Sequence, residues 1–322
     1  MIGLINFQSS IRSPDLLGKR RFGYKSSKLG MEKVAMGITQ LKGSLDERQY
    51  IFYWVTILST YVRCSLTKSS DKLIALSGIA KAFREVTGGT YLAGLWKDWL
   101  HYGLLWKTTP TSGSWIQRNE SYAPSWSWAS VTSTGTGADV ELETHEWMDD
   151  VVSLIRLVDE RIVTEPPGGD VTGLLRSAEL DIECRLLYFR ASKKSSSWLD
   201  LSWSFNVYAD EGKTECYIRS NSTKLFFDMS DRQESCEEKY EVEGTCIPLC
   251  TKRVGSGIDF DTKLLYYLML EVAGDGRFQR SGIIQSIFAS RGRSHPPQLQ
   301  QDRWGGWNIN NWAGVSSLIT LV

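Results

Sequence analysis

Two stretches near the start of the chain repeat apolar residues at helical spacing. In residues 46–64 one apolar stripe predicts an amphipathic helix, formed by Ile51, Trp54, Val55, Leu58, Tyr61 and Val62. In residues 71–86 a second stripe predicts another helix, with a buried face of Leu73, Leu76, Ile79, Ala80 and Phe83. Ser70 is the expected N-cap of this second helix, and the glycine pair at 88–89 supplies its stop. We expect the two helices to pack as a hairpin, with small residues such as Gly78 allowing close approach.

The connection that follows the helices is rich in tryptophan. Residues 91–106 are amphipathic but interrupted by two glycines, which predicts one or two short helices. Trp126 and Trp128 then alternate with small residues, and this period of two predicts a strand that begins at Pro124. We expect both indoles to be buried against the helix pair. The rival interpretation is an exposed aromatic platform for a ligand.

After residue 131 the apolar pattern changes to that of strands. Residues 151–158 form one apolar run, which favours a strand but leaves a helix open. A hairpin is expected where residues 263–272 turn at Ala-Gly-Asp-Gly and return from Phe278, since glycines supply the positive φ angles of a tight turn. Further strands are expected at residues 177–188, 201–208, 215–218 and 315–322.

These elements predict an α+β protein. An N-terminal helical segment with a tryptophan-rich connection is expected to pack on a mainly antiparallel β C-terminal region. We divide the chain into a poorly defined segment at 1–45, a helical and tryptophan-rich segment at 46–131, and a β-rich region at 132–322.

Composition narrows the class of partner. In 322 residues, 37 Lys and Arg balance 37 Asp and Glu, so the chain lacks the basic surface expected for nucleic acid or an anionic membrane. No apolar run approaches the roughly 18 residues of a membrane helix, and no signal peptide is expected at the start. Six cysteines without a CxxC pair favour reduced thiols in the cytoplasm. Cys236, Cys246 and Cys250 are close in sequence, but their spacing fits no zinc pattern.

Candidate chemistry is sparse. The chain has no Walker loop, no dinucleotide fingerprint, no metal-binding helix motif and no Gly-x-Ser-x-Gly. Its three histidines, His101, His145 and His295, do not nominate a catalytic triad by spacing. An acidic patch is expected to be a solvated face, formed by Glu143, Glu146, Asp149 and Asp150. We therefore expect no metal and no cofactor, although tryptophans beside carboxylates leave sugar binding as a minor alternative.

Four blocks of sequence carry a family resemblance. They read Leu-Thr-Lys-Ser-Ser-Asp-Lys-Leu-Ile-Ala-Leu-Ser-Gly-Ile-Ala at 66–80, Thr-Tyr-Leu-Ala-Gly-Leu-Trp at 90–96, Gly-Leu-Leu-Trp at 103–106 and Ala-Pro-Ser-Trp-Ser-Trp-Ala-Ser at 123–130. In order and spacing they resemble the segment that follows the core of fungal heterokaryon-incompatibility (HET) proteins. The hairpin block at 268–282 is similar to a late pattern of the same family. Residues expected to be structural in these motifs are Asp71, Lys72, Leu73, Gly78, Gly94, Trp96, Trp106, Pro124, Trp126 and Trp128.

The resemblance implies a role in nonself recognition and fungal cell death. The HET core is itself thought to be distantly similar to TIR domains, some of which cleave NAD. Its Leu-Ser-Tyr-x-Trp-Gly-like and Arg-Gly-Trp-x-x-Gln-Glu blocks are absent from residues 1–45, so the chain resembles a C-terminal portion and no catalytic residue can be carried over. Two hypotheses follow: a non-enzymatic recognition or scaffold region that binds protein partners, or an enzyme. The enzyme would be a TIR-like NAD hydrolase, if a core lies elsewhere, or a carbohydrate-active β domain.

Overall fold

The helical segment forms as its apolar stripes predict. The computed structural model describes residues 47–62, 68–109, 115–119, 121–133, 140–142, 151–193, 203–209, 216–231, 241–256, 260–291 and 316–322. The two predicted helices are confirmed as α3 (Glu47–Tyr61) and α4 (Lys72–Thr87). Gly88 ends α4 with a φ of 71°, and its N–H donates to the Arg84 carbonyl at 2.8 Å.

The start of α4 differs from the prediction. Ser70 lies in a 3₁₀ turn (Ser69–Asp71), and its hydroxyl donates to the Asp71 carboxylate at 3.0 Å instead of capping the helix. The residue that precedes α4 is Asp71, whose side chain also makes no cap hydrogen bond. The preceding 3₁₀ turn therefore takes the place of a side-chain cap.

The two helices pack as a hairpin, as expected. The Trp54 and Phe83 rings lie with their centroids 5.1 Å apart, and the Tyr61 hydroxyl donates to the Lys72 carbonyl at 2.7 Å. Gly78 does not serve this contact: it is exposed, and nothing lies within 4 Å of the place where a Cβ would stand. The expectation that Gly78 allows close approach is therefore wrong.

The segment expected to be one or two short helices is only partly helical. It begins with a small hairpin of β1 (Tyr91–Leu92) and β2 (Leu95–Trp96), because Ala93 and Gly94 take positive φ angles of 45° and 94° and close a two-residue turn. A 3₁₀ turn and the short helix α5 follow, at Lys97–Trp99 and Leu100–Gly103.

The strand predicted at Trp126 and Trp128 is wrong, although the predicted burial of both rings is confirmed. Trp128 opens a 3₁₀ turn (Trp128–Ser130), because the Ser127 hydroxyl accepts the Ala129 N–H at 3.1 Å and bends the chain. The two indoles are 0% and 1% exposed, which excludes an exposed aromatic platform. The short strands around them are β3 (Lys107–Thr108), β4 (Ile116–Arg118), β5 (Val131–Ser133) and β6 (Val140–Glu141).

The C-terminal region is one large, almost entirely antiparallel sheet, so the predicted α+β class is confirmed. Its members are β7 (Val151–Ser153), β8 (Arg156–Thr164), β9 (Leu175–Cys184), β10 (Leu187–Lys193), β11 (Trp203–Tyr208), β12 (Cys216–Phe227), β13 (Glu241–Ser256), β14 (Phe260–Gly274), β15 (Arg277–Arg291) and β16 (Ser317–Leu321). The apolar run at 151–158 is therefore extended, not helical. The hairpin of β14 and β15 is confirmed, with positive φ angles at Gly274, Asp275 and Gly276.

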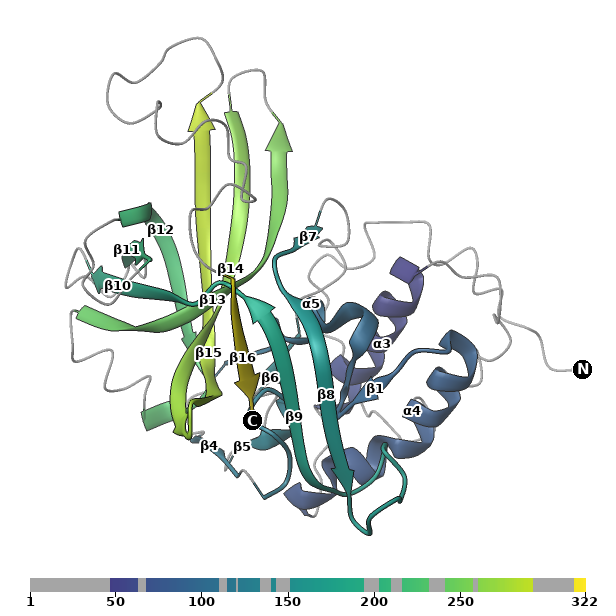
Figure 1. Ribbon diagram of the computed structural model, residues 1–322. Helices are drawn as coiled ribbons and strands as arrows, with labels where there is room; N and C mark the ends of the chain where they lie inside the picture. The colour runs from purple at the N-terminus through teal and green to yellow at the C-terminus, as the bar shows by residue number, and fades with distance from the viewer. Residues whose placement is uncertain are drawn as a thin grey trace, which may run out of the picture.

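Six of these strands close on themselves. The path runs β12–β11–β10–β13–β14–β15, and β15 pairs again with β12. From β15 the sheet continues through a parallel pairing to β16 and then through β9 to β8. In Figure 1, β8 and β9 stand to the left of α3 and α4, and buried side chains of β9 and β16 belong to the same apolar core as those of the two helices.

Two apolar cores result. The larger unites α3, α4 and the tryptophans with the inner faces of β9 and β16 and part of β13 and β14. The smaller fills the closed six-stranded part and includes Phe205, Tyr267 and Met269. Helical and β segments thus share one core. The predicted segment at 1–45 and the acidic patch, with Glu143, lie outside the described residues.

Candidate functional site

The aromatic residues of the resemblance gather into one buried cluster under the helix pair. Trp96 is its centre: its ring centroid lies 5.1 Å from Trp54, 5.1 Å from Phe83 and 5.4 Å from Tyr91. The contacts are mostly edge-to-face, which suits the aromatic quadrupole. Trp96 therefore has a packing role.

Gly94 and Trp128 are a matched pair. The Trp128 indole N–H donates to the Gly94 carbonyl at 3.1 Å, and its ring meets Tyr61 edge-on at 5.9 Å. A Cβ on Gly94 would lie 2.6 Å from the indole nitrogen of Trp128, which is shorter than side chains tolerate. The Ser127 hydroxyl donates to the Ala93 carbonyl at 2.6 Å and fixes the same junction. The two sequence blocks therefore interlock by close approach of a backbone to a ring.

Trp106 joins the helical segment to the β hairpin. Its indole N–H donates to the Trp126 carbonyl at 2.9 Å, and the guanidinium carbon of Arg280 lies 3.4 Å from its ring centroid. Arg280 also donates to the carbonyl of Leu104 at 2.6 Å and to that of Trp106. A cation stacked on Trp and bonded to its backbone holds β15 to this turn.

The charge of Arg280 is balanced by Asp228, which follows β12. Two guanidinium nitrogens of Arg280 reach the two carboxylate oxygens at 2.9 and 3.1 Å, and Arg118 donates to the same carboxylate at 2.8 Å. The side chains of Arg280 and Asp228 are 0% and 1% exposed. Burial lowers the pKa of the Arg280 guanidinium, while the Asp228 charge and hydrogen bonds act in the opposite direction. Nothing in the sequence pattern marks Asp228 as a buried residue. Arg280 lies in a block of the resemblance, but the pattern does not predict that its side chain is buried.

The other motif residues are less tightly joined to this cluster. Leu73 is buried, and the Lys72 ammonium donates to the Val131 carbonyl. Asp71 is half-buried, and its carboxylate accepts the Ser70 hydroxyl at 3.0 Å. Pro124 lines a surface cavity. Lys72, Leu73, Gly94 and the tryptophans therefore act in the fold, whereas Gly78 lies on the solvent side of α4.

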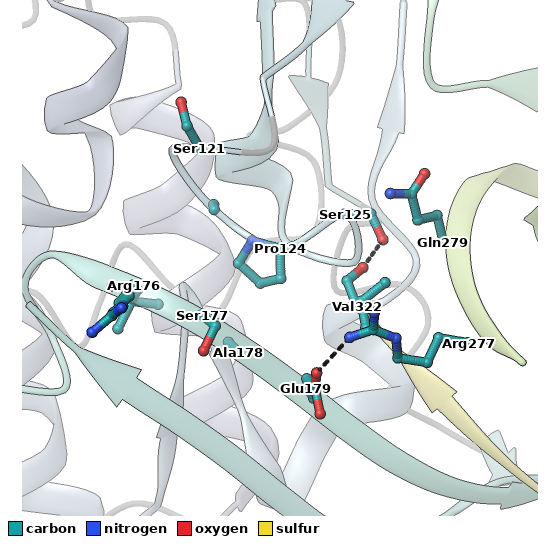
Figure 2. A pocket seen from close by; sticks show the side chains of 12 residues that line it. Ser121, Pro124, Ser125, Arg176, Ser177, Ala178, Glu179, Arg277, Gln279 and Val322 are labelled. Carbon is teal, nitrogen blue, oxygen red and sulfur yellow. Dashed lines mark hydrogen bonds and ion pairs between the residues drawn. The ribbon is translucent and has the colours of Figure 1, made fainter. Parts of the chain in front are cut away.

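The cavity beside Pro124 is a polar hollow at the junction of the helical and β segments. It encloses about 200 Å³ between β9, the start of β15 and the turn at 121–125 (Figure 2). Its lining includes Ser121, Ser125, Ser177, Glu179, Arg277 and Gln279. Arg277 donates to Glu179 at 3.1 Å, and the Ser125 hydroxyl donates to the Val322 carbonyl. Among the described residues no histidine lines it, so none of them supplies its serines with the usual base of a nucleophile.

Burial shifts the pKa values of His101, Cys184 and Cys246 away from neutral pH. His101 stacks on Tyr102 with centroids 4.6 Å apart, and burial lowers its pKa to about 4. Burial raises the pKa of the Cys184 thiol to about 12 and raises that of Cys246 as well, so neither is a thiolate at neutral pH. No disulfide joins the described cysteine side chains, and Cys236 lies outside the described residues.

In the part of the chain that the structure describes, no group of three or more His, Cys, Asp or Glu side chains could hold a metal ion, and no helix is long and apolar enough to cross a membrane. Comparisons of the chain with protein-family models, with curated proteins and with solved structures find no match. The geometry therefore defines an α+β protein with an aromatic–arginine core and a small polar cavity beside it.

Proposed function

We propose that the chain is a non-enzymatic recognition or scaffold region of a HET-type protein, which binds protein partners in the cytoplasm. The observation that carries this proposal is the packing of the motif residues. Gly94, Trp106 and Trp128 make internal contacts that join the helical and β segments. Residues that resemble the family thus support a shared fold. We therefore assign the function to the surface of that fold rather than to a catalytic cleft.

An enzyme is the weaker candidate. The cavity of about 200 Å³ beside Pro124 is smaller than the roughly 300–1,000 Å³ of ordinary small-molecule sites, and a dinucleotide such as NAD needs more room. A larger hollow of about 550 Å³ lies between the end of α4 and β8, but Glu160, the carboxylate in its described lining, is paired with Lys97 at 2.7 Å. In the cavity beside Pro124, Glu179 is the one acidic side chain of the described lining, and it is neutralised by Arg161 and Arg277 at 3.0 and 3.1 Å. A carboxylate held in this way is poorly placed to stabilise a new positive charge.

Two experiments test the proposal. In the first, the purified chain is incubated with NAD at high protein concentration, and we expect no release of nicotinamide. Steady release that Glu179→Gln abolishes would instead establish hydrolysis. In the second, the chain is expressed in a filamentous fungus and scored for growth arrest, with NAD content measured in parallel. Arrest without NAD loss supports the recognition role; normal growth alongside a folded, abundant chain contradicts it.

A further inference from the structure

Strand β8 has an open edge in the middle of the chain. It is the last strand in the order of the large sheet, and β9 is its one neighbour among the described strands. The hydrogen bonds of the sheet determine which backbone groups face this edge. The Val322 N–H donates to the Phe278 carbonyl at 2.9 Å, so the preceding residue, Leu321, directs its groups toward β9, where it faces Leu180.

The same alternation continues across β9 into β8. Leu180 directs its N–H and C=O toward β16, so Glu179 directs its own toward β8, where it faces Arg161. Glu160 and Ile162 lie on either side of Arg161 and therefore direct their N–H and C=O away from β9. Among the described residues, neither makes a backbone hydrogen bond on that side.

Strand β1 has an open edge as well. The Lys97 N–H, just after β2, donates to the Thr90 carbonyl, just before β1, at 2.9 Å. Thr90 therefore directs its groups toward β2, and the next residue, Tyr91, directs its N–H and C=O to the opposite side. Tyr91 is 2% exposed and its ring packs on Trp96, so its backbone, rather than its ring, borders the surface.

These two open edges border one hollow, which we call the α4–β8 hollow. It encloses about 550 Å³, and its described lining includes Glu160, Ile162 and Tyr91 together with residues 88–90 after α4. Strand β1 lies beside β8 in Figure 1. Unpaired N–H and C=O groups on strand edges are the partners that an extended peptide requires. The volume falls within the roughly 300–1,000 Å³ of sites for small ligands, so the hollow accepts a few residues of chain but not a folded domain.

The charges at the α4–β8 hollow favour a carboxylate. Glu160 is neutralised by Lys97 at 2.7 Å, whereas Arg84, also in the lining, has no ion-pair partner among the described residues. The Asp98 carboxylate lies 3.2 Å from where a Cβ on Gly89 would stand, but it is not part of the described lining. A guanidinium binds a carboxylate through two parallel hydrogen bonds, and the end of a peptide supplies one. Undescribed residues that lie before or between described ones supply no terminal carboxylate.

We propose that the α4–β8 hollow binds the last few residues of a partner protein, extended between β8 and β1. The backbone of these residues pairs with Glu160 and Ile162 on one side and with Tyr91 on the other, and their terminal carboxylate accepts hydrogen bonds from Arg84. This inference rests on the proposed recognition role, for which it supplies the surface and the kind of partner.

Mixtures of acetylated tripeptides test this mode of binding. One mixture varies all three residues and keeps the free carboxylate; the matched control mixture carries a terminal amide instead. At millimolar total concentration we expect the acid mixture to slow amide exchange at Tyr91, Glu160 and Ile162 by about tenfold, and the amide mixture by less than about twofold. Arg84→Gln should remove this difference, whereas Arg190→Gln, at an exposed ion pair of β10, should keep it. Equal protection by the two mixtures would overturn the proposal.

Further measurements separate a partner protein from other occupants. Tripeptides that the chain retains are identified by mass spectrometry and placed at the end of an unrelated carrier protein, which should give the same protection. Failure of the carrier would make the ligand a free peptide. Protection of the three amides in the free chain at micromolar concentration would show that residues of this chain fill the hollow, and protection that rises with chain concentration would identify a second copy. Each of these three results would overturn the proposal.

A blocking variant connects the hollow to growth arrest. Thr90 is exposed in the lining, so Thr90→Trp should fill the hollow and abolish both the peptide protection and the arrest. The matched control, Ser121→Trp in the cavity beside Pro124, should leave both intact. Growth arrest by Thr90→Trp equal to that of the wild type would overturn this inference, yet leave the recognition role standing. Peptide protection in a wild-type chain that causes no arrest would support the binding site and contradict the recognition role.

Discussion

The buried carboxylate of Asp228 offers the sharpest test of how the two segments are joined. It accepts hydrogen bonds from Arg280 at 2.9 and 3.1 Å and from Arg118 at 2.8 Å. Asp228→Asn keeps the size of the side chain but removes the negative charge and replaces one acceptor oxygen with a donor. Both guanidiniums would then be buried without a counter-charge.

The magnitude follows from the burial of the pair. Breaking a buried ion pair by removing one partner typically costs about 3–5 kcal/mol, because an uncompensated charge remains. The side chains of Arg118 and Asp228 are 6% and 1% exposed, and that of Arg280 is 0% exposed, so water offers little relief. We therefore expect Asp228→Asn to lower the free energy of unfolding by about 3–5 kcal/mol.

Urea denaturation followed by tryptophan fluorescence measures this loss. The matched control is Glu243→Gln, which breaks an ion pair to Arg190 at 3.1 Å whose side chains are 54% and 44% exposed. Exposed pairs contribute about 0–1 kcal/mol, so this control should change little. A loss below about 1 kcal/mol for Asp228→Asn would show that the charges are hydrated and that the interlock at Arg280 is not as described.

Three other predictions concern the helical segment. Gly94→Ala should lower the free energy of unfolding by more than about 1 kcal/mol, because the φ of Gly94 is 94° and the new Cβ would collide with Trp128. Gly78→Ala, at an exposed helix position with free space around the new Cβ, should raise it by about 0.5–1 kcal/mol in the same urea titration. Trp128→Ala should cost about 3–5 kcal/mol, against less than about 1 for the partly exposed Trp115, and equal melting temperatures would refute the core role. Burial lowers the pKa of His101 from 6.5 to about 4, so between these pH values only the unfolded chain takes up a proton at this residue. The free energy of unfolding should therefore fall by up to about 3 kcal/mol as the pH drops from 7 to 4, and His101→Gln should flatten that profile.

The elements that sequence predicts correctly depend on local pattern. Apolar residues at every third or fourth position predict helices α3 and α4, and glycines at the turn predict the β14–β15 hairpin. The errors fall where a local signal is overruled by a contact. Trp126 and Trp128 alternate as a strand would, but the Ser127 hydroxyl bends the backbone into a 3₁₀ turn. Ala93 has an ordinary propensity, yet it takes a positive φ in a two-residue hairpin.

Long-range pairings were beyond the reach of sequence pattern. Arg280 and Asp228 are 52 residues apart, and either alone is an ordinary charged residue of a strand or loop. The closure of the sheet needs β12 to pair with both β11 and β15, and nothing in the alternation of a strand identifies its second neighbour. The cavity depends on the same pairings, since its described lining combines β9, the start of β15 and the turn at 121–125.

The interlock at Arg280 and the turn that borders the cavity are joined through Ser125. The Ser125 hydroxyl accepts the backbone N–H of Arg280 at 3.1 Å and donates to the Val322 carbonyl. The turn that borders the cavity is therefore bonded to Arg280, the residue that stacks on Trp106. Substitutions in the core, such as Trp128→Ala, would therefore disturb the cavity as well and cannot separate folding from recognition. Ser121 is exposed at the cavity mouth, and its side-chain hydrogen bond goes to Asn119 in the same turn. Ser121→Trp should thus fill the cavity at an unchanged melting temperature. Loss of growth arrest in this variant would place the recognition surface at the cavity, whereas unchanged arrest would exclude it.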